Sequence, residues 1–173
     1  PPGRYTFEDY LEGDSISNRR IRIVVVIDVE ADRIRFDFSG TDDMVQGPIN
    51  CRWPSVAACV NFVVKCITDQ DMPPNAGSYL PLEIVTREGS LLGAIYPAAV
   101  CNANLVLTQR IADVLFGAFL QAVPERVIAA CSGTMNLLNI GGPNPRLGRY
   151  FSYVETYGGG QGALHCQDGM DGV

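Results

Sequence analysis

Apolar residues recur at every second position in two segments near the start of the chain. One segment is 21–27, with isoleucine or valine at each odd position, and the other is 34–38, where Ile34, Phe36 and Phe38 alternate with charged residues. A period of two predicts strands with one buried face each. The polar stretch Glu30-Ala31-Asp32 between them predicts a β-hairpin. Residues 1–19 are polar and mixed, and we expect a lead-in there, anchored by Tyr5, Phe7 and Tyr10.

Two longer segments predict helices. Trp53 to Ile67 begins with Pro54 in the first turn and is apolar nearly all round, with Lys65 as its only charge, so we expect it to be the more buried helix. Residues 108–123 are amphipathic and end before Pro124. Their apolar stripe consists of Ile111, Val114, Leu115 and Ala118, with Arg110, Asp113 and Gln121 elsewhere on the surface.

The remaining pattern predicts short strands. They cover 82–86, 127–131, 135–140 and 150–156, with glycine-rich stretches at 141–143 and 158–160 as separators. The element order is then ββαβαβββ, in which strands outnumber helices and the connections are irregular. This order predicts an α+β fold, a mixed or antiparallel sheet with two long helices, in one domain spanning 1–173.

Charge and hydropathy narrow the classes of partner. Only 18% of the residues are charged, which leaves room for a surface covered by a partner protein, and the net charge of −6 opposes nucleic acid and anionic membranes. The longest conspicuous apolar run, 23–27, is far shorter than the roughly 20 residues that cross a bilayer. We therefore expect no nucleic acid and no membrane among the partners.

The six cysteines lie at 51, 59, 66, 101, 131 and 166 and contain no Cys-x-x-Cys pair. Four have strongly apolar neighbours, where a thiol behaves as a small hydrophobe. Reduced thiols are favoured over disulfides, and with them a cytoplasmic location.

Small polar residues and glycines gather at the predicted strand ends. Ser132-Gly133-Thr134 offers two hydroxyls, and it serves either to bind polar groups of a substrate or to form a bend. The stretch Gly158, Gly159 and Gly160 lacks the lysine of a phosphate loop, which favours a tight turn. Because backbone donors become free at strand ends, we expect Asn50, Ser132, Thr134 and these three glycines to line one pocket for the carbonyl or carboxylate of a small-molecule substrate.

His165 is the only histidine in the chain. It supplies at most one imidazole ligand, beside Cys166, Asp168 or Asp171, so no metal site is predicted. Nucleophilic catalysis would pair His165 with Ser132 or Cys131, but no Gly-x-Ser-x-Gly elbow surrounds the serine. The catalytic residues therefore stay unknown at this level.

Nine short motifs occur in a defined order along nearly the whole chain. They are Phe38-Ser39-Gly40-Thr41, Gly47-Pro48-Ile49-Asn50, Pro73-Pro74-Asn75-Ala76-Gly77, Glu88-Gly89-Ser90-Leu91-Leu92, Gln109-Arg110-Ile111-Ala112-Asp113, Ser132-Gly133-Thr134-Met135-Asn136, Glu155-Thr156, Gly158-Gly159-Gly160 and Asp168-Gly169-Met170-Asp171-Gly172-Val173. With these motifs the chain resembles the hydantoinase B/5-oxoprolinase family, which includes the B-type component of N-methylhydantoinase, the C-terminal half of 5-oxoprolinase and a large subunit of acetone carboxylase. The family usually carries a glutamate where this chain has Val106, so the resemblance assigns no role there.

The resemblance implies an internal fragment of a longer chain, since family members have several hundred residues and histidines outside this segment. It implies an ATP-dependent amidohydrolase of the hydantoin or 5-oxoproline type. A hydantoinase A-type ATP-binding subunit or domain would phosphorylate the cyclic amide, and this part would hold the activated substrate. ATP with Mg, and a transition metal, would belong to the parent complex, with no cofactor in the fragment, which we expect to be inactive alone. A fragment of a ketone carboxylase subunit and a non-catalytic assembly module remain the alternatives.

Overall fold

The computed structural model describes residues 1–73 and 75–172. Its main sheet has four strands in the order β1-β2-β3-β4. Their bounds are Gly3–Leu11 for β1, Ile21–Val29 for β2, Ile34–Asp37 for β3 and Leu82–Val85 for β4. The first three strands pair antiparallel and β4 pairs parallel with β3. The sheet is therefore mixed, which confirms the predicted α+β class.

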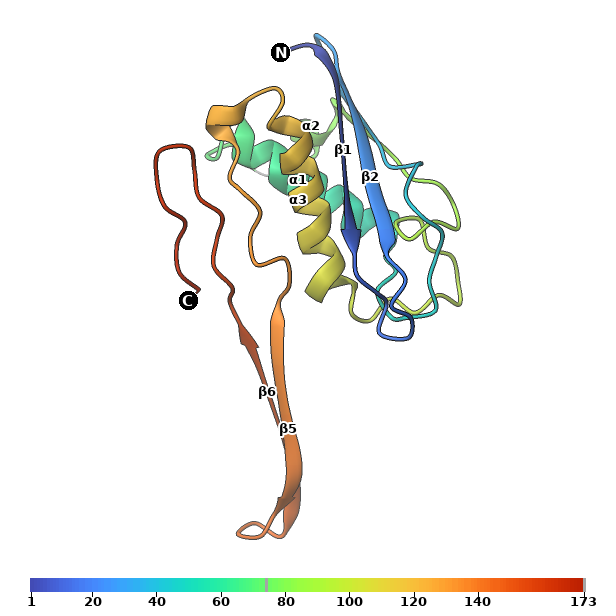
Figure 1. Cartoon of the computed structure of the whole chain (residues 1–173), viewed down its shortest axis with the longest axis vertical. Coiled ribbons are helices and arrows are strands. Elements are labelled where there is room, and N and C mark those ends of the chain that lie inside the picture. The colour runs from blue at the N-terminus through green and yellow to red at the C-terminus, as the bar shows by residue number, and fades with distance from the viewer. Residues whose placement is uncertain (74, 173) are drawn as a thin grey trace.

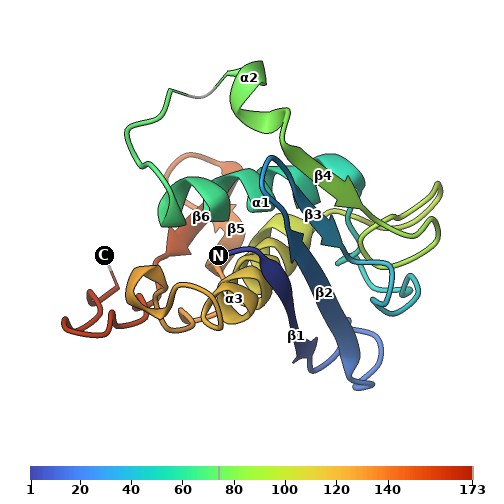
Figure 2. The same cartoon turned by 90° about the horizontal axis from the view of Figure 1, so that it is seen from above.

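Two long helices cover one face of this sheet (Figure 2). Helix α1 spans Trp53–Ile67, as predicted, with Pro54 in its first turn. Helix α3 spans Thr108–Phe119 and continues a π-helical turn, η1, at Ala103–Leu107. The short elements α2 (Ala76–Tyr79) and η2 (Pro124–Arg126) complete the helical part. None of these helices has both the length and the apolar composition that crossing a membrane requires.

The core lies between the sheet and the two helices. The odd-numbered positions of β2 from Ile21 to Ile27 are all buried, as their alternation predicts, together with Phe36 and Phe38. Phe36 meets Phe119 of α3 edge to face, with ring centroids 6.1 Å apart. The helices contribute Val56, Val60, Val63, Ile111, Val114 and Leu115, all fully buried. This continuous packing fixes the orientation of α3, the helix on which the candidate site is built.

A long antiparallel hairpin projects away from this body (Figure 1). It consists of β5 at Asn136–Asn144 and β6 at Arg149–Tyr157, and nearly all of its residues are exposed. The predicted separator 141–143 lies inside β5, and the turn falls at 145–148 instead. The two strands thus form one arm whose base adjoins the helices.

Two further expectations about the strands are wrong. Residues 1–19 contain the edge strand β1, which pairs with β2 along its whole length. Residues 127–131 form no strand, and the backbone N–H of Ala129 instead donates to the carbonyl of Ala163. Edge strands need only one partner and tolerate polar residues on both faces, so β1 shows no clear alternation. The observed order is βββαβαββ, apart from the short helical turns.

The helices also differ from expectation in burial. Helix α3 buries seven of its twelve residues, whereas α1 buries six of its fifteen, so α3 is the more buried. Phe62 and Trp53 of α1 are exposed despite their apolar character. Helix α3 ends at Phe119, four residues before the predicted end, because Pro124 opens a separate 3-10 turn.

Candidate functional site

The base of the β5–β6 hairpin brings two of the predicted site segments together. Pairing in the hairpin places Asn136 opposite Tyr157, so the residues just outside it, 131–135 and 158–161, become neighbours. The backbone N–H of Ser132 donates to the carbonyl of Gly160 at 3.1 Å. Segments more than twenty residues apart in the sequence thereby form one wall of a cavity.

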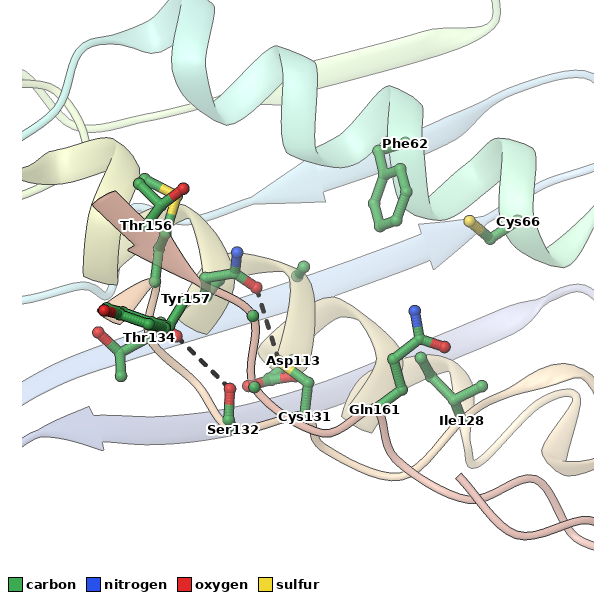
Figure 3. Close-up of a pocket in the computed structure, with 15 residues that line it drawn as sticks. Phe62, Cys66, Asp113, Ile128, Cys131, Ser132, Thr134, Thr156, Tyr157 and Gln161 are labelled. Carbon is green, nitrogen blue, oxygen red and sulfur yellow. Dashed lines mark hydrogen bonds between the residues drawn. The ribbon is translucent and has the colours of Figure 1, made fainter. Parts of the chain in front are cut away.

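This cavity measures about 550 Å³ and lies between that wall, α1 and α3 (Figure 3). Four of the six predicted site residues line it, namely Ser132, Thr134, Gly158 and Gly159. Gly160 does not line it, although its carbonyl holds Ser132 in place. Further polar groups come from Gln109, Asp113, Cys131 and Gln161, and apolar surface from Phe62, Cys66, Ala112, Ile128 and Met135. One side of the cavity is therefore polar and the other apolar.

Close approach of backbone and side chain explains one glycine at this wall. A Cβ atom on Gly159 would lie 1.7 Å from the Ser132 hydroxyl oxygen, so no larger residue fits while Ser132 keeps its position. Gly133 adopts a φ of +75°, a left-handed conformation that favours glycine. The serine and threonine hydroxyls are thus carried on a sharply bent turn at the edge of the cavity.

Asp113 is the most unusual polar residue of the cavity. It is only 9% exposed, and its Oδ2 atom has no hydrogen-bond partner among the described residues. The nearest cation is Arg110, whose Nη1 lies 3.9 Å from that oxygen and binds Asp9 instead. Burial raises the pKa of Asp113, only partly offset by the backbone N–H of Cys131, which hydrogen-bonds to the carboxylate. The expectation that Asp113 lies outside the buried face of its helix is therefore wrong.

The loop of Cys131 is anchored to the helix at two further points. The thiol of Cys131 lies 3.5 Å from Oε1 of Gln109 and accepts the N–H of Gly133. The carbonyl of Leu105, in the π-helical turn, accepts the N–H of Met135 at 2.7 Å. Wider helical turns of this kind are frequent at functional sites. The sequence analysis did not select Cys131 or Asp113 for the pocket, although Asp113 stands in one of the motifs that carry the family resemblance and Cys131 directly precedes another.

Asn50 is not part of this cavity. Its side chain is fully buried, and its amide nitrogen donates to the carbonyls of Val45, Gly47 and Ala99 at 2.9 to 3.0 Å. Its Oδ1 accepts the N–H of Val45. All of its hydrogen-bonding capacity is used to join two loops, so its placement in the predicted pocket is wrong.

His165 is exposed and does not line the cavity. In the part of the chain that the structure describes, no hydrogen bond links it to Ser132 or Cys131, and the geometry that an autonomous hydrolase needs is not assembled. Over residues 1–73 and 75–172, no three His, Cys, Asp or Glu side chains are placed to hold a metal ion. The six cysteines are free thiols, and burial raises the pKa of Cys51 to about 12 and of Cys59 to about 11.

Similar proteins share both the sequence and the fold. The chain is 34% identical over 166 residues to 5-oxoprolinase 1 of Arabidopsis thaliana, which covers 96% of this chain and 12% of that protein. The structure of the ATP-dependent caprolactamase from Pseudomonas jessenii matches 98% of the chain and 30% of its own, with a TM-score of 0.85 and 24% identity. Acetone carboxylase in its nucleotide-free structure matches 98% and 25%, with a TM-score of 0.77 and 16% identity.

At these identities the two solved structures show a common fold. The chain spans between about an eighth and a third of the length of these proteins. The model of the hydantoinase B/oxoprolinase family matches residues 1–173. This chain belongs to the hydantoinase B/oxoprolinase family.

Proposed function

We propose that this chain is the substrate-holding part of an ATP-dependent amidohydrolase that acts on cyclic amides. The observation that carries the proposal is the cavity of about 550 Å³, whose polar wall is made from three of the family motifs. Its size and its division into an apolar and a polar side suit a small ring compound with one amide group. The names of a 5-oxoprolinase and an ATP-dependent caprolactamase among the similar proteins support this substrate class.

The chain's own contribution is binding and orientation. The apolar side, with Phe62 and Ile128, would take the methylene groups of the ring, while Ser132 and Thr134 would face the amide. An amide oxygen is a poor leaving group until it carries phosphate. Hydroxyl and backbone donors held on a rigid turn would stabilise the charge that develops on the activated substrate.

ATP and metal ions belong to other parts of the assembly in this proposal. The chain has no Gly-x-x-x-x-Gly-Lys sequence, and the described residues do not fit a metal site. A hydantoinase A-type subunit or domain would bind ATP with Mg, in keeping with a similar protein from Pseudomonas that is named as one subunit of a D-/L-hydantoinase. The 173-residue chain alone would therefore neither hydrolyse ATP nor open the ring.

A ketone carboxylase is the second candidate, because acetone carboxylase has the same fold. The test is to supply the full-length, assembled protein with ATP and either a lactam, 5-oxoproline, a hydantoin or acetone with bicarbonate, and to follow ADP and organic products. Ring-opened acid formed only in the presence of ATP supports the proposal. ADP and acetoacetate formed from acetone and bicarbonate, with every cyclic amide left intact, would refute it in favour of the carboxylase.

A further inference from the structure

Asp113 presents a buried carboxylate oxygen to the cavity without a partner among the described residues. A buried polar atom left without a hydrogen bond costs about 1–3 kcal/mol, and more when it is charged. The other bond of the carboxylate, from the N–H of Cys131, fixes its orientation toward the loop 131–134. The free oxygen is therefore held in place and offers a single acceptor position inside the cavity.

The donors nearest to this acceptor lie on the same loop. Ser132 follows Cys131 directly, and its hydroxyl makes only a long contact of 3.4 Å to the carbonyl of Thr134. Figure 3 shows Asp113, Cys131 and Ser132 grouped on one side of the cavity. An acceptor and a donor thus stand next to each other on one wall.

The geometry points to recognition of the N–H edge of a cyclic amide by Asp113, with the amide carbonyl turned toward Ser132. A small ring holds its amide in the cis form, so that N–H and C=O lie on the same edge. Such an edge complements an acceptor placed beside a donor. The inference rests on the proposed function and adds to it that the substrate is a secondary amide with a free ring N–H.

The test compares three ring compounds of similar size on the full-length, assembled protein without ATP. Caprolactam carries the N–H, N-methylcaprolactam has lost it, and caprolactone has an oxygen in its place. Binding is measured by isothermal titration calorimetry on the wild type, on D113N and on T156W. D113N keeps an acceptor for Cys131 but turns a donor toward the ligand, while T156W fills the rim of the cavity from an exposed strand position.

The wild type should bind caprolactam at least about tenfold more tightly than either analogue, the effect of one hydrogen bond to a charged group. In D113N the preference should fall below about threefold. A wild-type ratio near one overturns the inference whether or not D113N folds, and so does an unchanged ratio in a folded D113N. T156W separates the two claims, because caprolactam binding that persists in T156W places the ligand elsewhere and refutes the proposed function itself.

Discussion

Replacing Gly159 by alanine should break the contact on which the polar wall of the cavity depends. The new Cβ atom would lie 1.7 Å from the hydroxyl oxygen of Ser132 and 2.2 Å from its Cβ, far inside van der Waals contact. Ser132 cannot simply move aside, since its backbone N–H is bonded to Gly160. The φ of Gly159 is outside the left-handed region, so crowding alone causes the effect. We expect a loss of about 1–3 kcal/mol in the free energy of unfolding, the usual cost of overpacking.

The matched control is alanine at the next glycine. A Cβ atom on Gly160 would meet its nearest neighbour, the carbonyl oxygen of Met170, at an ordinary 3.6 Å. G160A should therefore change the free energy of unfolding by less than about 0.5 kcal/mol. Urea denaturation of the 173-residue chain, followed by far-ultraviolet circular dichroism, measures both variants.

A double variant identifies the cause of the loss. S132G removes the two atoms that collide and leaves only the Cα atom of residue 132, at 3.7 Å. Alone it should cost about 0.5–1 kcal/mol through added backbone freedom. Combined with G159A it should remove most of the penalty, a coupling of at least about 1 kcal/mol. Strictly additive effects, or G159A no worse than G160A, would refute the packing at this wall.

Three other predictions address the core, the buried carboxyl and the hairpin. V60D should lower the free energy of unfolding by several kcal/mol or prevent folding, because the side chain is fully buried, whereas A58D on the exposed face of the same helix should melt cooperatively in circular dichroism. Because burial raises the pKa of Asp113 in the folded chain, folding takes up a proton, and stability should decline as the pH rises from the unfolded-state pKa of about 3.9 through the folded-state pKa. Urea denaturation across this pH range should show the decline in the wild type and not in D113N. Replacing residues 142–151 by a two-residue Asn-Gly turn should shift the free energy of unfolding by less than about 0.5 kcal/mol, since the removed part of the arm is almost entirely exposed; a large loss would show that the arm packs on the body.

Local signals in the sequence suffice for the elements that carry most of the core. Helix α1 is predicted to the residue because Pro54 marks its first turn and an unbroken apolar run follows it. The buried face of β2 follows from its alternation. In both cases neighbouring residues alone determine the structure, since side-chain direction depends on helical or strand period.

The errors arise where the partner of a segment lies far away in the sequence. Strand β1 exists because β2 offers a free edge, and nothing in Arg4 or Glu8 indicates a strand by itself. Val127 and Ile128 favour a strand by composition, yet no neighbouring strand in the described part of the chain pairs with them. Asn50 has the composition of a binding residue, and only the carbonyls of distant loops reveal that its amide is fully occupied.

Four residues of the predicted pocket come together because the hairpin returns the chain to its own starting point. The prediction grouped Ser132, Thr134, Gly158 and Gly159 for their small size and polarity, and the pairing of β5 with β6 supplies the proximity. Asp113 was missed for the converse reason. On the helix it stands near an apolar stripe, and it becomes buried when the loop 131–134 folds over it.

The burial of Asp113 reduces stability without a compensating contact to its second oxygen among the described residues. An apolar residue at this position would avoid the desolvation that raises the pKa of the carboxyl, and it would leave no oxygen without a partner. Polar groups that weaken a fold are concentrated at sites that bind or react, where the missing partner comes from a ligand. The same residue contacts the loop that carries Ser132, so one side chain both orients the polar wall and leaves an acceptor open in the cavity. A stability cost at this position is what a site for an amide N–H requires.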